Sequence, residues 1–561
     1  MMKPKGFRGW FPLLALALAV LALLALACEE EEKPTPTPTQ AVQATPTPRP
    51  EAKPTGDLTV AVPVLTANFG SWERTVGSVQ FLSPAADLLV YISRDWSKLI
   101  PGLAKEWQVS PDNTSVTFRL REGVQFHDGW GELTSEDVKF TIEAAIGEGS
   151  KNGEAISFIK PLIDRIVTEG PYQLTIFAKG AKADLIPWML SPATVAYLPI
   201  VSKKYVESVG RDQANQKGIF AGPYRITEYR ANDRLVLEAL DTHWRLVGEF
   251  KRIIFQAVPE QATRAALLKT GEVDVIETTA EGAKTTAGGD FAVVSVKGAT
   301  HLDQLFGGLW LPGTPTYDPN VPWLNVKVRE AMNIAINRTE IAEKIFSGFA
   351  RPSSTYRPWP WSNKFQPYPY NPERAKQLLA EAGYPQGFDV SMWILRFPGQ
   401  AAEIAQMVQA VAGYWEAIGL KTKVETFDST VVLDKILGRQ TSGIIYQIAP
   451  TALFPWEQGL ANFYSKDRRF PVGGEGADTD ALYERILAST SKEERERLGE
   501  QMTGILYQEY RTIPIVSTDR LFLKNSKKVG KWEPSLVSRD ILYWEYSTHA
   551  PALGTFRLFE P

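Results

Sequence analysis

Residues 370–388 have the sequence YNPERAKQLLAEAGYPQGF, which predicts one complete helix with both of its ends. Asn371 can cap the start, and Pro372 suits the first helical position because its missing N–H would have no partner there. Apolar residues then recur at helical spacing, and Gly383 can end the helix. The predicted buried stripe consists of Ala375, Leu378, Leu379 and Ala382.

Two similar helices are predicted on either side of this stretch. Asn325 can cap the earlier one, which we expect to stop at Gly348, and Gly419 ends the later one. Residues 420–424 then alternate as in a strand. Helices of this length between strands predict the α/β class. The two apolar faces are Val328, Met332, Ala335 and Ile336 in the first helix, and Ile404, Val408, Val411 and Trp415 in the second.

The first part of the chain carries local signals of the same kind. Alternating apolar residues predict strands at 58–62 and 116–120. Thr134, followed three residues later by Asp137, is typical of a capping box at the start of a helix. These elements extend the α/β pattern toward the N-terminus.

Length and composition exclude several classes of protein. A chain of 561 residues is too long for one hydrophobic core, which stops growing at about 250–300 residues. With 61 basic and 64 acidic residues there is no positive excess for a nucleic-acid surface, so no nucleic-acid partner is expected. The single cysteine, Cys28, excludes disulfides within the chain and multi-thiolate metal sites. The 16 tryptophans and 4 histidines favour aromatic binding surfaces over histidine chemistry.

The N-terminus has the layout of a secretory signal. Three basic residues are followed by an uncharged run at 10–27, which ends in Leu24-Ala25-Leu26-Ala27-Cys28. This ending resembles a bacterial lipobox, with Ala25 where leucine is usual, and predicts a signal peptide at 1–27 and lipidation of Cys28. The alternative is a retained helical anchor, although the run is just short of the ~20 residues that a bilayer needs.

Residues 28–56 alternate proline and threonine after an acidic start. This composition cannot build a core and favours an extended polyproline II conformation. We interpret the segment as a lipid-anchored, semi-rigid spacer that holds the folded part away from the membrane. A merely disordered tail is the alternative.

The sequence contains no recognisable catalytic or metal-binding motif. No Gly-x-Ser-x-Gly elbow and no Walker-type phosphate loop occur, and the four histidines are widely separated. Residues 473–476 are glycine-rich and predict a mobile surface loop, and the charged run 493–497 predicts a solvated helix face. We therefore expect no enzyme activity, no catalytic residue, no cofactor and no metal site.

Four longer stretches resemble one protein family. They are GLAKEWQVSPDNTSVTFRLREGVQFHDG at 102–129, continuing into LTSEDVKFTIE at 133–143, AGPYRITEYRANDRLVLEALDTHW at 221–244, LNVKVREAMNIAINRTEIAEKIFSG at 324–348, and the stretch at 370–388. In residue type, spacing and order they resemble family 5 of the extracytoplasmic solute-binding proteins of ABC importers, the oligopeptide-, dipeptide- and nickel-binding group. Ala221 stands where that family commonly has threonine.

The resemblance implies a two-lobed α/β fold of the periplasmic-binding-protein type (class II), with an extra subdomain inserted in the first lobe. Lobe I would comprise 57–92, 213–299 and 512–561, the inserted subdomain 93–212, and lobe II 300–511. Such proteins close around a ligand by hinge motion and hand it to ABC permease subunits. We expect a monomer, tethered by its lipid outside the cytoplasm, in the periplasm or on the outer face of the cell membrane.

The resemblance leaves the ligand open. Peptide-binding members typically carry an aspartate in a stretch resembling Asp-Tyr-Pro-Asp-Pro, which meets the peptide's ammonium, because an unpaired buried charge is costly. The corresponding residues 446–456 contain no acid before Glu457. The candidate ligands are therefore a peptide or an oligosaccharide. A sensory or chaperone-like receptor on the same scaffold, and a secreted hydrolase with an unrecognised site, are the alternatives to import.

Aromatic residues near the expected cleft are the candidate ligand contacts, since flat rings stack on sugars and surround apolar or cationic groups. Trp359 and Trp361 lie among prolines and could instead cover a lobe edge. Arg396 could pair with a ligand carboxylate, or form a surface salt bridge. The complete candidate set is Phe69, Trp72, Trp310, Tyr356, Trp359, Trp361, Trp393, Arg396, Tyr446, Gln447 and Trp456.

Overall fold

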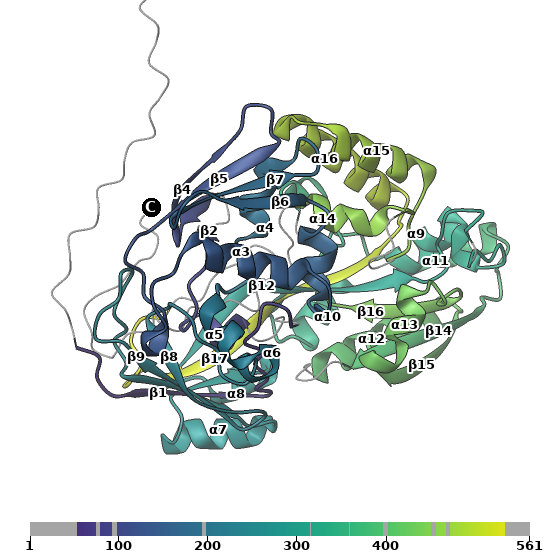
Figure 1. Ribbon diagram of the computed structural model, residues 1–561. Helices are drawn as coiled ribbons and strands as arrows, with labels where there is room; N and C mark the ends of the chain where they lie inside the picture. The colour runs from purple at the N-terminus through teal and green to yellow at the C-terminus, as the bar shows by residue number, and fades with distance from the viewer. Residues whose placement is uncertain are drawn as a thin grey trace, which may run out of the picture. The chain divides into compact units, whose positions relative to one another are not determined.

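The computed structural model describes residues 53–73, 79–92, 98–192, 198–314, 316–357, 359–396, 402–449, 456–466 and 472–532 (Figure 1). All of them belong to one compact unit, Ala52–Pro561. The predicted signal peptide, Cys28 and most of the Pro/Thr-rich spacer lie outside the described residues, as does the stretch 533–561 of predicted lobe I. No helix in the described part of the chain has the length and apolar character needed to cross a bilayer.

One mixed sheet runs through the described part of the chain. Parallel pairs of strands occur on both flanks of this sheet. The two longest strands lie between the flanks and are antiparallel to each of their neighbours in the sheet. From one edge to the other the order is β15 (Lys421–Asp428), β14 (Asp389–Arg396), β16 (Ile444–Ile448), β12 (Phe291–Phe306), β17 (Ile513–Asn525), β11 (Val275–Thr278), β1 (Asp57–Val62), β10 (Arg252–Ala257), β9 (Arg234–Ala239) and β8 (Tyr224–Arg230). The short strand β13 (Ala350–Pro352) pairs with β17 off this path.

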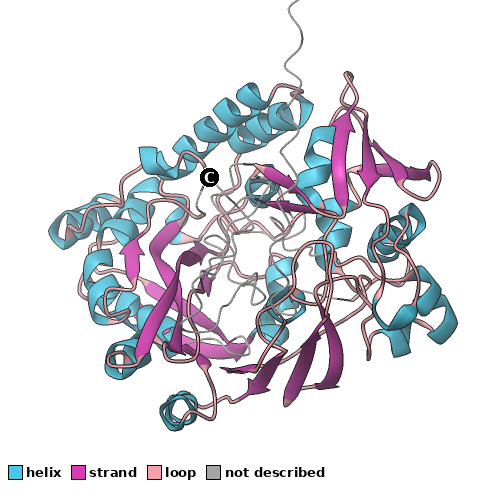
Figure 2. Cartoon of the chain, turned by 90° about the vertical axis from the view of Figure 1, so that its left-hand side faces the viewer, coloured by secondary structure: helices cyan, strands magenta, loops and turns pink. Residues whose placement is uncertain are grey.

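A second, antiparallel sheet is built from a stretch of chain between β1 and β8. Its order is β4 (Ala104–Val109), β5 (Ser115–Leu120), β7 (Gln173–Ala178) and β6 (Ile163–Thr168), and β2 (Val90–Ile92) pairs separately with β3 (Leu99–Pro101). Figure 2 shows the small sheet apart from the strands of the main sheet. These strands fall almost entirely within the predicted insertion at 93–212, whose boundaries stay a prediction.

Helices cover the strands. In the first half of the chain they are α2 (Val79–Leu82), α3 (Ser135–Ile146), α4 (Ile186–Met189), α5 (Lys203–Val209), α6 (Arg211–Ala214), α7 (Gln261–Thr270) and α8 (Ala280–Thr286). In the second half they are α9 (Val326–Ile334), α10 (Arg338–Lys344), α11 (Pro372–Glu381), α12 (Ala402–Glu416), α13 (Ser429–Leu437), α14 (Glu457–Leu460), α15 (Ala477–Ala488) and α16 (Lys492–Gln508).

Most predicted elements are confirmed, and one is wrong. β1, β5, β15, α3 with its capping box, α11 and α12 form where local signals placed them. The helix predicted to run from Asn325 to Gly348 is two helices, α9 and α10. The side chain of Asn337 accepts a hydrogen bond from the Glu340 N–H and starts α10 anew. A short polar side chain that bonds to nearby backbone competes with a continuous helix.

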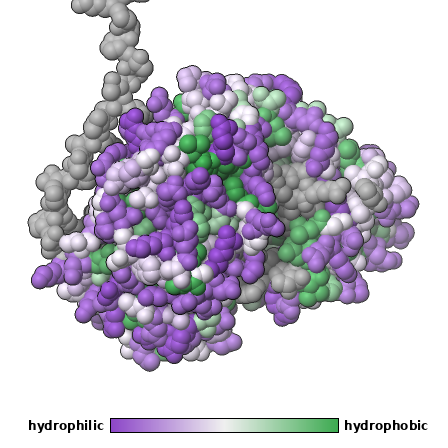
Figure 3. All heavy atoms as spheres, viewed as in Figure 1, coloured by the Kyte–Doolittle hydropathy of each residue, from purple (hydrophilic) through white to green (hydrophobic). Residues whose placement is uncertain are grey.

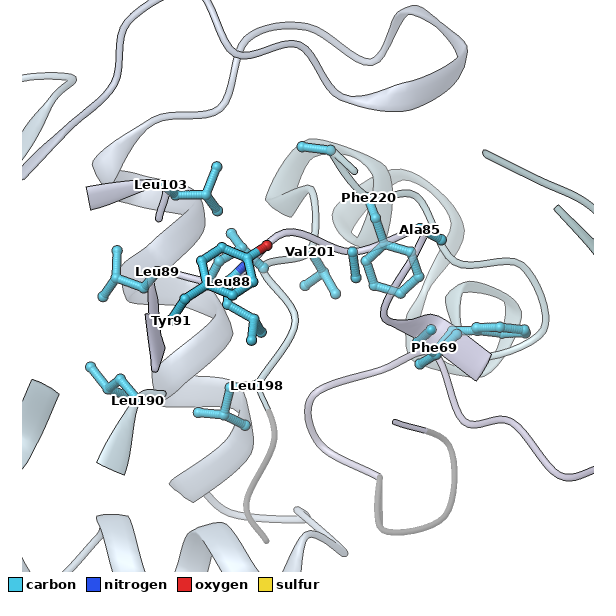
Figure 4. Close-up of a cluster of buried hydrophobic side chains, with 14 of the residues drawn as sticks. Phe69, Ala85, Leu88, Leu89, Tyr91, Leu103, Leu190, Leu198, Val201 and Phe220 are labelled. Carbon is cyan, nitrogen blue, oxygen red and sulfur yellow. The ribbon is translucent and has the colours of Figure 1, made fainter. Parts of the chain in front are cut away.

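Three hydrophobic cores contain most buried residues. The first joins β1, β5 and α3 with the segments around Leu88 and Phe220 (Figure 4). The second packs α9, α11 and α12 on one face of β12, β14 and β16. The third lies on the opposite face, since Leu305 and Tyr446 belong to it while Phe306 and Ile445 belong to the second. Successive residues of a strand point to opposite faces of a sheet, which explains this division.

β12 and β17 are the strands that join the two flanks of the main sheet. They pair antiparallel from Phe291↔Asn525 to Gln304↔Ile513, with irregularities between Val296 and Thr300 and between Leu302 and Asp303. Gly298 lies in the first irregularity at a φ of +60°, which favours glycine. The buried carboxylate of Asp519 accepts hydrogen bonds from the Gly298 N–H (3.0 Å) and the Ser295 hydroxyl (2.7 Å). The Asp519 side chain therefore stabilises the first irregularity in the pairing of β12 with β17.

Candidate functional site

Six of the predicted ligand residues gather in the third core. We call these six the aromatic cluster: Tyr356, Trp359, Trp361, Trp393, Tyr446 and Trp456. Strand register explains part of this gathering, because Trp393 on β14 lies beside Tyr446 on β16, and Tyr446 lies beside Leu305 on β12. The phenol of Tyr446 is fully buried, and burial raises its pKa well above the ordinary range. It therefore stays neutral at physiological pH.

Two of the tryptophans pack against α16. The rings of Trp361 and Trp456 meet edge to face at 4.8 Å, and the Trp361 indole N–H donates to the Thr503 hydroxyl at 2.9 Å. Gly499 on α16 faces both rings, and a Cβ at this position would clash with the ring of Trp361. The position of these rings favours packing within the core over ligand contact, and their role in binding stays a prediction.

Phe69 and Trp72 belong to a different core from the aromatic cluster. Phe69 belongs to the first core, where its ring lies near Phe220 (Figure 4) and meets Tyr229 edge to face at 5.0 Å. Trp72 is in the same core. Trp310 is buried, and the Arg439 guanidinium lies 5.8 Å from its ring centre. The structure therefore does not place Phe69 and Trp72 in the core that contains the aromatic cluster.

Gln447 and Arg396 are engaged within the protein. The Gln447 side-chain amide donates to the Leu395 carbonyl at 3.0 Å and accepts from the Leu395 N–H at 3.2 Å, so it continues the pairing of β16 with β14. Arg396 is exposed and forms a salt bridge with exposed Asp428 at 3.1 Å. These contacts match the surface-pair alternative for Arg396.

The polar group that sequence reasoning missed lies on β12. Asp303 and Gln304 are almost completely buried, and in the part of the chain that is described neither carboxylate oxygen of Asp303 nor either amide atom of Gln304 has a hydrogen-bond partner. Burial raises the pKa of Asp303 well above its ordinary value, and the positive charges of Arg357 and Arg338 oppose that rise. The only sequence signal was an acid and an amide between the apolar residues Leu302 and Leu305.

Two further expectations are corrected. Residues 473–475 are buried and not a surface loop, because the Glu475 carboxylate takes a hydrogen bond from Arg439 in the interior. The charged run at 493–497 is not wholly solvated. Arg495 is 5% exposed and donates to the carboxylates of Asp184 at 2.6 Å and Glu457 at 3.1 Å. The charged sequence pattern of that helix gave no sign of this buried ion-pair network.

No group of three or more histidine, cysteine, aspartate or glutamate side chains in the described residues is arranged to hold a metal ion. Figure 3 shows a mainly hydrophilic face on which hydrophobic side chains gather in a patch near the centre. The site's chemistry therefore rests on buried aromatic rings, one unpartnered carboxyl and one unpartnered amide. A few polar groups among apolar and aromatic side chains can fix the orientation of a bound molecule.

Two known binding proteins are similar in sequence to this chain. The heme-binding protein A of Haemophilus influenzae is 25% identical over 459 residues, which cover 76% of this chain and 80% of that protein. The dipeptide-binding protein of Escherichia coli is 26% identical over 378 residues, covering 62% of this chain and 66% of that protein.

The fold has counterparts among solved structures. The periplasmic binding protein DppA of Helicobacter pylori, an ABC-transporter-associated protein solved with the peptide STSA, matches 89% of this chain and 99% of its own with a TM-score of 0.71 at 20% identity. This likeness shows the two-lobed fold. Residues 98–469 match the middle region of the bacterial extracellular solute-binding proteins, family 5. The chain belongs to that family of extracellular solute-binding proteins.

Proposed function

We propose that this protein is the substrate-binding component of an ABC importer, and that it captures a peptide or another oligomeric solute and delivers it to permease subunits. The observation that carries the proposal is the family match over 98–469 on a sheet whose two flanks are joined by the long strands β12 and β17. The relatives named for dipeptide binding and solved with a peptide favour a peptide over an oligosaccharide.

Capture follows from a shift between open and closed arrangements of the lobes. Solute contacts that form only when the lobes close stabilise the closed state in proportion to their free energy. The permease then distinguishes loaded protein from empty protein. The solute is released unaltered, and the proposal includes no bond breaking.

In this proposal the N-terminal segment determines where the protein is located. Lipidation of Cys28 after removal of residues 1–27 tethers a monomer through the spacer 28–56. A tether raises the effective concentration of the binding protein at the permease without any new contact.

A thermal-shift panel tests solute capture. Di- to pentapeptides of mixed sequence, glutathione, and a set of malto- and xylo-oligosaccharides are each added to the folded chain. A ligand that binds only the native state stabilises it by about 2.7 kcal/mol at a hundredfold excess over Kd. We expect members of the peptide set to raise the melting temperature. A response to sugars alone would replace the peptide with the oligosaccharide alternative, and a flat response to both sets would contradict solute capture.

A further inference from the structure

Asp303 lies in the middle of the main sheet, beside the aromatic cluster. It pairs with Ile448 of β16 on one side and with Pro514 of β17 on the other. Because alternate residues of a strand share a face, the Asp303 side chain lies on the face of Leu305, which belongs to the core of the aromatic cluster. Tyr356 of the aromatic cluster belongs to the same core as Leu305.

This carboxyl has no hydrogen-bond partner in the described chain. It is 0% exposed, and both oxygens lack a donor. Arg338 is nearby but donates to the backbone carbonyls of Pro514 (2.6 Å) and Asn333 (2.9 Å). Leaving a carboxylate buried and unpaired is costly, and such groups are normally paired or hydrogen-bonded. We therefore look for a hydrogen-bond donor to Asp303 in a bound solute.

The surroundings fit a positively charged nitrogen. Tyr356 and Tyr446 are buried aromatic residues of the same core as Leu305. Tyr356 also meets Phe463 edge to face at 5.3 Å, which fixes its ring. Aromatic faces attract cations, and the attraction increases when water is excluded. A carboxyl among such rings has the chemistry that recognises an ammonium group.

The charged groups nearby are compatible with this chemistry. The guanidiniums of Arg357 and Arg338 favour the ionised form of Asp303 and so reduce the cost of ionising it when a ligand arrives. His301, on the same strand, has its pKa lowered to about 3 by burial and by Arg357, so it adds no charge at neutral pH. Asp303 is the group in this set that can accept from a ligand cation.

We propose that Asp303 binds a positively charged nitrogen of the solute, such as the free α-ammonium group of a peptide. This inference rests on the proposed function of solute capture. Residues 446–456 contain no acid before Glu457, and Asp303 lies next to Ile448, where that stretch leaves β16. The neighbouring strand thus supplies the negative charge that the stretch itself lacks.

Calorimetric and thermal-shift titrations of the full chain test this assignment. The probes are phenethylammonium chloride with phenethyl alcohol as its neutral twin, and trileucine with N-acetyl-trileucine. The proteins are the wild type, Asp303→Asn and, as a matched control, Asp389→Asn, which changes an exposed aspartate at the start of β14. We expect the two amines to bind the wild type and the control, and Asp303→Asn to weaken that binding at least ~30-fold, the scale for truncating one partner of a buried charge pair.

The outcomes separate this inference from the proposed function. Amine binding that is equal in wild type and Asp303→Asn would overturn it, as would equal binding of the amines and their neutral twins, or no amine binding at all. A response to N-acetyl peptides or sugars in that last case would leave solute capture standing. Conversely, Asp303-dependent binding of phenethylammonium supports the inference even if no peptide binds. Asp303→Leu, which removes an unpaired carboxyl, is expected to melt no lower than wild type and shows that lost binding is not lost folding.

Discussion

Replacing Arg495 by methionine is expected to destabilise the folded chain by about 3–5 kcal/mol, the range for removing one partner of a buried ion pair. Arg495 on α16 donates to Glu457 on α14, to Asp184 in the 3₁₀ turn η3 (Ala183–Leu185) and to the Ser489 carbonyl. Burial raises the pKa of Glu457, and the charge of Arg495 opposes that rise. Without Arg495 the Glu457 carboxyl is left buried and uncompensated.

Arg497→Met is the matched control for this prediction. It lies two residues away on the same helix, but its side chain is 57% exposed and pairs with exposed Glu494. Exposed pairs of this kind contribute about 0–1 kcal/mol. The two variants and the wild type are compared by urea unfolding at pH 7. Equal effects of the two substitutions would contradict the buried network.

Mild acid is expected to destabilise the protein through two buried histidines. Burial lowers the pKa of His127 to about 4 and that of His301 to about 3, from an ordinary value of 6.5. Between pH 6.5 and those values the unfolded chain binds more protons than the folded chain, so stability falls as the pH falls. A shift of one pKa unit corresponds to about 1.4 kcal/mol, so each histidine removes on the order of 3 kcal/mol by pH 4.

The histidine effect is isolated with variants, because Asp303 acts in the opposite direction. A carboxyl with a raised pKa binds a proton in the folded state first, so its contribution to stability increases as the pH falls. We therefore compare wild type with His127→Gln/His301→Gln by urea unfolding at pH 7.5 and pH 5. The double variant should lose less stability between these two pH values. An identical loss would show that the histidines are not buried in the neutral form.

Local signals predicted the fold well where one short segment decides the structure. The Asn371-Pro372 start and Gly383 end define α11, and Thr134 with Asp137 defines the start of α3. The break between α9 and α10 depends on one side chain, Asn337, whose bond competes with a helix that the apolar pattern would continue. A pattern of apolar residues cannot show that competition.

The candidate site was less predictable, because burial and partners come from distant segments. Trp393 and Tyr446 could be found as aromatic residues, yet only strand register places them side by side. Phe69 looks the same in sequence but belongs to another core. In the sequence Arg495 cannot be distinguished from its solvated neighbours. Its partner Asp184 lies more than three hundred residues earlier in the chain. Asp303 is an ordinary acid in the sequence, and its lack of a donor is visible only in three dimensions.

Native mass spectrometry of the folded chain mixed with an equimolar pool of di- to pentapeptides tests solute capture most directly. The account predicts a complex of one protein and one peptide, and release of that peptide at its original mass when the complex is dissociated. Peptide fragments after release, or a protein that stays at its unliganded mass with this pool and with an oligosaccharide pool, would contradict it.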